Sequence, residues 1–135
     1  MRLASRSARF AGQIVDGIVA IVPIGVVAAF DDPELPASTL YLPALLFIIG
    51  YLLFADALPG GQSLGKRLLG IAVVDDASYA PCSVFQSFVR NLVAPILGVF
   101  DWVFIFGSRR RRLGDMVAGT IVVDRGSAYA ELDHP

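Results

Sequence analysis

The sequence predicts an all-α membrane protein with two transmembrane helices, a third apolar helical segment and a short two-stranded cytoplasmic ribbon. Three observations support this prediction. The 135 residues are 56% hydrophobic and 17% charged, whereas a soluble domain of this size has about 25% charged residues. Two long stretches, residues 10–30 and 35–55, are strongly apolar. A short motif that ends in strand-forming residues occurs twice.

The first predicted span, residues 10–30, contains one ionisable side chain, Asp16. At about 1.5 Å per residue it is about 31 Å long, which matches a hydrocarbon core of about 30 Å. Arg9 shares a helix face with Asp16 but lies about 10 Å from it along the axis. Each therefore needs a partner from elsewhere in the chain or from a second subunit. Gly12 and Ala20 flank Asp16 and form a small-residue face that another helix, including one of a partner, could approach.

The second predicted span, about residues 40–58, has one ionisable side chain, Asp56, near its far end. The acidic loop 31–39 between the spans contains no lysine or arginine. Three arginines precede the first span, and Lys66 and Arg67 follow the second. Because positive residues favour the cytoplasmic side, we expect the N-terminus and the chain after the second span to be cytoplasmic.

An internal repeat follows the spans. Residues 64–75 align without gaps to residues 113–124 with the pattern L-G-x4-G-x2-V-V-D. Each copy predicts a turn of helix, a glycine break and a short strand, and a lone strand of this length is unstable. We expect strand 71–74 to pair with strand 120–123. The alternative is chance similarity between two apolar runs.

The third apolar segment, residues 83–108, either spans the membrane or enters it and returns. A single crossing would place the following arginine run outside, against the charge rule, and would separate the two repeat copies. A re-entrant or interfacial segment avoids both problems, and Pro95 and Gly98 supply a break. We therefore favour two short helices over a single crossing. The expected helices cover about 82–94 and 96–107.

Four segments occur in a specific order: residues 4–17, 61–71, 89–91 and 112–123. Together they resemble the RDD family of small bacterial membrane proteins over about residues 4–125. The resemblance implies one membrane domain, residues 1–125, before a polar tail, residues 126–135. It also implies a multi-pass protein of the bacterial cytoplasmic (inner) membrane.

The resemblance further implies that one arginine and two aspartates carry the family pattern. Arg9 and Asp16 match the arginine and the first aspartate, and Asp115 matches the second, with Asp56 as the alternative. The family has no settled molecular function, although ion or proton exchange has been suggested for it. The segment between residues 91 and 108 departs from the family pattern, because it is short for a third full span.

Asp16 allows two functional interpretations. A carboxylate within a membrane can bind a proton or a monovalent cation, which would suit a cation/proton exchanger or transporter component. It can instead hold helices together by pairing with an arginine, for which we expect Arg90 or the Arg9 of a neighbouring subunit. We favour the second interpretation. The protein would then be a structural or accessory membrane subunit that forms a homo-oligomer, or binds another membrane protein, through an intramembrane Arg/Asp network.

Further charged residues have predicted partners. Asp115 occupies the repeat position of Lys66, so we expect it to pair with Lys66 or Arg67. Asp101 and Trp102 form a candidate interfacial pair. A basic cluster after the third segment is expected to face anionic lipid headgroups, at about 1 kcal/mol per charge, and nothing around it predicts nucleic-acid binding. This cluster comprises Arg109, Arg110, Arg111 and Arg112.

The remaining composition indicates no catalytic chemistry. The single histidine, His134, lies in the polar tail, and the single cysteine, Cys82, has no partner for an internal disulfide. No nucleophile–base pair and no metal-ligand spacing is found. We therefore expect no enzyme activity, no metal and no cofactor, and a buried or interfacial thiol at Cys82.

Overall fold

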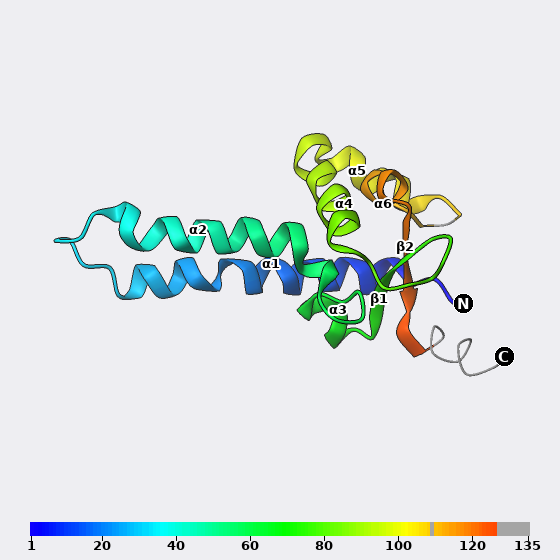
Figure 1. The fold of residues 1–135 in the computed structure, drawn as a ribbon, viewed down its shortest axis with the longest axis horizontal. Coiled ribbons are helices and arrows are strands. Elements are labelled where there is room, and N and C mark those ends of the chain that lie inside the picture. The colour runs from blue at the N-terminus through cyan, green and yellow to red at the C-terminus, as the bar shows by residue number, and fades with distance from the viewer. Residues whose placement is uncertain (109, 127–135) are drawn as a thin grey trace.

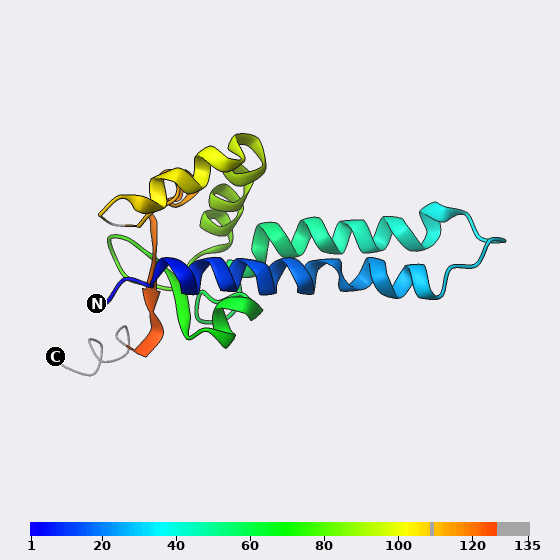
Figure 2. The same cartoon turned by 180° about the vertical axis from the view of Figure 1, so that it is seen from behind.

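The computed structural model describes residues 1–108 and 110–126. Two long helices form a hairpin, and the other elements gather as a head at its open end, where the N-terminus and β2 also lie (Figure 1). Seen from behind, α1 continues into the head (Figure 2). The elements are α1 (Arg6–Ala29), α2 (Ala37–Phe54), the 3-10 helix η1 (Ala55–Ala57), α3 (Leu64–Leu68), β1 (Ile71–Asp75), α4 (Val84–Leu97), α5 (Val99–Val103), the 3-10 helix η2 (Phe104–Phe106), α6 (Leu113–Ala118) and β2 (Thr120–Asp124).

The hairpin confirms the two predicted spans, because α1 and the continuous helix formed by α2 and η1 are each long and apolar enough to cross a membrane. Helix α1 begins earlier than predicted because Ser5 caps it: the Ser5 hydroxyl accepts a hydrogen bond from the backbone N–H of Ala8. Pro23 lies inside α1, and the helix continues through it.

The two repeat copies form the predicted ribbon. Strands β1 and β2 pair antiparallel, with Val73 opposite Val122. Each strand follows a short helix and a glycine in the left-handed region, Gly70 with φ 65° and Gly119 with φ 68°. Beside the ribbon, Cys82 is buried, as expected, and burial raises the pKa of its thiol to about 11.

The third apolar segment consists of two helical pieces, α4 and α5–η2, bent by 115° at their junction. The bend lies at Gly98, whose φ of 55° favours glycine, and Pro95 lies within α4. This confirms the predicted pair of helices and assigns the break to the glycine. Because β1 precedes the segment and β2 follows it, the pairing of the strands places both ends of the segment in the head.

The small-residue face of α1 is occupied by the same chain. A Cβ atom on Gly12 would lie 3.6 Å from Leu69 and 3.7 Å from Lys66, in or next to α3, and Ala20 is 1% exposed. The expectation that a partner uses this face is therefore wrong. The two helices approach closely because Gly65 lacks a side chain at the crossing, where a Cβ atom would overlap the Gly12 carbonyl oxygen.

Candidate functional site

Eight buried charged side chains meet where the hairpin joins the head. Each is at most 7% exposed, and four are positive and four negative, so the cluster is neutral as a whole. Charges removed from water are stable only when they are paired or hydrogen-bonded. The charged cluster comprises Arg9, Asp16, Asp56, Lys66, Arg90, Asp101, Arg112 and Asp115.

Asp16 lies at one end of this cluster and is bound mainly by neutral groups. Its Oδ1 accepts hydrogen bonds from the Tyr51 hydroxyl at 2.9 Å and the Gly65 backbone N–H at 2.8 Å. Its Oδ2 accepts one from the Ser63 hydroxyl at 2.5 Å. The cation nearest to Asp16 is Lys66, whose Nζ lies 3.8 Å away. The prediction that Asp16 pairs with an arginine is therefore wrong, because α3 brings Lys66, and its N-cap residue Ser63 brings a hydroxyl, to this face of α1.

Lys66 and Arg90 both bind Asp56. The Lys66 Nζ lies 2.5 Å from Asp56 Oδ1, and Arg90 Nη1 donates to Asp56 Oδ2. The side-chain amide of Asn91 also donates to Asp56 Oδ2, at 3.1 Å. Asp56, at the end of the second span, therefore links a cation from α3 to a cation from α4.

Asp115 is a second carboxylate of the cluster that binds two cationic side chains through hydrogen bonds, and both of these are arginines. Arg90 Nη2 lies 2.5 Å from Asp115 Oδ1, and Arg9 Nη2 lies 2.5 Å from Asp115 Oδ2. Arg9 Nη1 also donates to the Arg110 carbonyl. The predicted pairing of Asp115 with Lys66 or Arg67 is wrong. Lys66 binds Asp56 instead, and the exposed Arg67 donates to a backbone carbonyl of the preceding turn.

The arginines around Asp115 determine its protonation state. Burial alone would raise its pKa, but the positive charges of Arg90, Arg112 and Arg9 outweigh burial and lower the pKa of Asp115 well below its usual range. The ionised Asp115 side chain therefore stabilises the folded state fully at pH values above its unfolded pKa of about 3.9. It is lost only as the pH falls toward the lower folded value, so Asp115 stays charged at neutral pH.

The basic run after the third segment does not act as one lipid-facing cluster. Arg112 is 3% exposed, and its Nη1 lies 3.6 Å from Asp101. Arg111 forms an ion pair with Asp76 at 3.2 Å. Arg110 donates to a backbone carbonyl of the N-terminal arm. The predicted contact with lipid headgroups is therefore wrong for Arg112, which turns inward to neutralise a carboxylate, and Arg109 lies outside the described residues.

Asp101 shows how the repeat extends into the site. Its Oδ1 accepts a hydrogen bond from the Gly114 backbone N–H at 2.8 Å, just as Asp16 accepts one from Gly65. Gly65 and Gly114 are equivalent repeat positions. Each short helix therefore begins at a carboxylate of a neighbouring helix. Asp101 is fully buried, so it does not form the predicted interfacial pair with Trp102.

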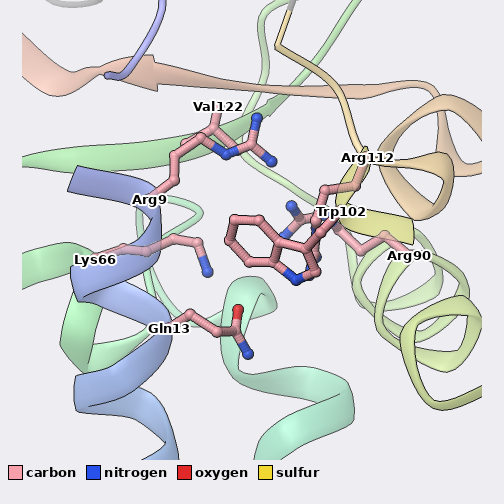
Figure 3. A pocket seen from close by; sticks show the side chains of 7 residues that line it. All are labelled: Arg9, Gln13, Lys66, Arg90, Trp102, Arg112 and Val122. Carbon is pink, nitrogen blue, oxygen red and sulfur yellow. The ribbon is translucent and has the colours of Figure 1, made fainter. Parts of the chain in front are cut away.

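A small cavity lies within the charged cluster, lined by all four of its cations. Figure 3 shows Arg9, Lys66, Arg90 and Arg112 around it, with the Trp102 ring in its wall. Its volume of about 10 Å³ admits about one water-sized molecule. In the described part of the chain, the Nε of Arg112 makes no hydrogen bond. An organic substrate does not fit in this arrangement.

A family model described as the RDD family matches residues 3–119. The chain belongs to the RDD family. Searches of curated proteins and of solved structures found no significant match. In this RDD protein, the residues matched to the family arginine and first aspartate, Arg9 and Asp16, are both in the charged cluster. Both candidates for the second aspartate, Asp115 and Asp56, contact the same residue, Arg90.

The sequence did not reveal three polar residues of this RDD site, namely Tyr51, Ser63 and Asn91. Ser63 is the N-cap residue of α3, and its hydroxyl also binds Asp16. Tyr51 carries one of the two tyrosine hydroxyls in the second span, with Tyr41, and a hydroxyl within a span is the signal that could have drawn attention to it. Asn91 directly follows Arg90 within a family-like segment, without a pattern that predicts its contact with Asp56.

Proposed function

We propose that this protein is a non-catalytic accessory subunit of the bacterial cytoplasmic membrane, with α1 and α2 spanning the bilayer. The observation that carries this proposal is that the charged cluster closes within one chain. Charges that are already paired and enclosed stabilise one arrangement of helices. Among the described residues, each of the four carboxylates of the cluster has a cation within 4.0 Å. The cluster would then fix the head rigidly on the hairpin.

The distribution of charge supports a cytoplasmic head. The hairpin loop carries Asp31, Asp32 and Glu34, whereas the lysine and the arginines all lie in the other parts of the chain. Under the positive-inside rule the loop faces outward and the N-terminus faces the cytoplasm. We place α4–α5 at the cytoplasmic interface, where it enters the bilayer and returns. Its apolar side chains include Phe85 and Val99, which are 75% and 81% exposed.

The outside of the hairpin offers a surface for a protein partner. Ile21 in α1 and Leu46 in α2 are 60% and 61% exposed, whereas the face of α1 at Gly12 is covered by α3. We propose that a second copy of this chain, or another membrane protein, contacts these outer faces.

Cysteine cross-linking tests the accessory role. In a Cys82→Ala background, two copies of Leu46→Cys should form a disulfide in native membranes when iodine is added as the membrane-permeant oxidant, because the side chain faces outward. Ala44→Cys, at a position 5% exposed, is the matched control and should not react. Absence of cross-links from both Leu46→Cys and Ile21→Cys at native expression would contradict the accessory role.

A cation or proton exchanger is the second candidate, and one observation favours it. Asp16 is surrounded by oxygen donors, the Tyr51 and Ser63 hydroxyls, and Lys66 is 3.8 Å away. Hard oxygen ligands of this kind suit small cations and protons. Opening of the head would be needed to admit the ion.

Flux measurements separate the two candidates. If the protein is an accessory subunit, proteoliposomes containing it should show no more proton or sodium flux than empty vesicles. Asp16→Asn should then leave the proton and sodium flux unchanged. Flux that is present in the wild type, lost in Asp16→Asn and retained in Asp32→Asn, a change in the hairpin loop, would replace the accessory proposal with exchange.

A further inference from the structure

An apolar groove of about 370 Å³ lies between the first turns of α1 and the α5–η2 segment. Phe10, Trp102, Val103 and Phe106 line it. The Phe10 and Trp102 rings meet edge to face, with centroids 6.2 Å apart, while Phe106 is 72% exposed. The groove is therefore an apolar surface formed by side chains that pack against one another, and the described chain does not fill it.

Arg6 lies at the rim of this groove. Its Nε donates to the Ile105 carbonyl at 3.3 Å, and its guanidinium carbon lies 5.5 Å from the centroid of the Phe106 ring. In the described part of the chain Arg6 forms no ion pair with a carboxylate, unlike the enclosed Arg9 one turn later. The Arg6 guanidinium is thus fixed in position beside apolar side chains, and no described carboxylate pairs with its charge.

This combination matches the two parts of a phospholipid. A guanidinium binds phosphate oxygens through parallel N–H donors, and an acyl chain buries apolar surface in a groove. We propose that the groove is a binding site for one anionic phospholipid, with its phosphate on Arg6 and an acyl chain against Trp102. This site replaces the inward-facing Arg112 as a contact for anionic headgroups.

The lipid proposal rests on the membrane placement of the hairpin and is independent of the accessory role. A protein that fails the cross-linking test can still bind lipid, and the reverse also holds. The sign of the charge selects the occupant, because a zwitterionic lipid or an apolar helix would gain less from Arg6 than an anionic headgroup does.

Trp102 provides the measurement, because it is the only tryptophan in the chain and lines the groove. The full chain is placed in phosphatidylcholine nanodiscs with a small fraction of lipid brominated on its acyl chain. Brominated phosphatidylglycerol should quench Trp102 with about fivefold higher apparent affinity than brominated phosphatidylcholine, as expected for about one surface charge. Unlabelled phosphatidylglycerol should reverse the quenching.

Variants assign the preference to Arg6. Arg6→Gln should remove it, Arg6→Lys should keep part of it, and Arg67→Gln, the matched exposed control, should leave it unchanged. Equal quenching by both lipids in the wild type would overturn the proposal, because the groove would then hold bulk lipid. Absence of quenching by either would also overturn it, because no acyl chain would then lie against Trp102. A preference that survives Arg6→Gln would place the headgroup site elsewhere and would also overturn it.

Discussion

Replacement of Arg90 by methionine is expected to lower the free energy of unfolding by about 3–5 kcal/mol. Arg90 is 1% exposed and binds Asp56 and Asp115 together. Methionine keeps much of the side-chain volume but removes the charge, so the neutral cluster would carry one uncompensated negative charge away from water. Denaturation by SDS in mixed micelles, followed by helical circular dichroism, measures the change.

Two further variants make this result specific to the cluster. Arg67→Gln removes an exposed arginine that donates to a carbonyl and should change the stability by no more than about 0.5 kcal/mol. Arg90→Met combined with Asp56→Asn restores neutrality, so the double variant should be less destabilised than the sum of the single changes. If Arg90→Met costs as little as Arg67→Gln, the cluster is not buried and paired as described.

Features encoded within one stretch of sequence were predicted well. The length of an apolar run sets a span, so both helices of the hairpin could be expected before their partners were known. The ribbon could be predicted because both copies of the repeat end in a strand-forming stretch, and a short strand is stable only when it pairs with another strand. The early start of α1 escaped prediction because Ser5, which caps it, is separated from the apolar run by further polar residues.

Pairing between distant charges was predicted poorly. Lys66 and Asp115 are at equivalent repeat positions and were expected to meet, but Asp56 and Arg90 lie between them in the cluster. Spacing along one helix determines which face a residue occupies, as it did for Arg9 and Asp16. It does not determine which helix packs against that face, and so which residue of opposite charge becomes the partner. That choice depends on close packing of backbones, which the glycines control.

Gly114→Ala is expected to lower the free energy of unfolding by about 2–3 kcal/mol, as overpacking of a close contact does. A Cβ atom there would lie far inside contact distance of the Arg90 backbone carbonyl oxygen. The neighbour is backbone, so no change of rotamer can relieve the clash, and α6 must move away from α4. That movement would also disturb the Gly114 N–H bond to Asp101 and the contact of Asp115 with Arg90.

Gly65→Ala should behave in the same way, because its Cβ atom would overlap the Gly12 carbonyl oxygen of α1. Gly17→Ala is the matched control within α1: nothing lies within 4 Å of the added Cβ atom, and alanine should raise helix stability by about 0.5–1 kcal/mol. SDS denaturation of the three variants measures the differences. If Gly114→Ala and Gly65→Ala are as stable as Gly17→Ala, the short helices do not contact α4 and α1 through these glycines. Close approach of backbones would then not be what brings the charged cluster together.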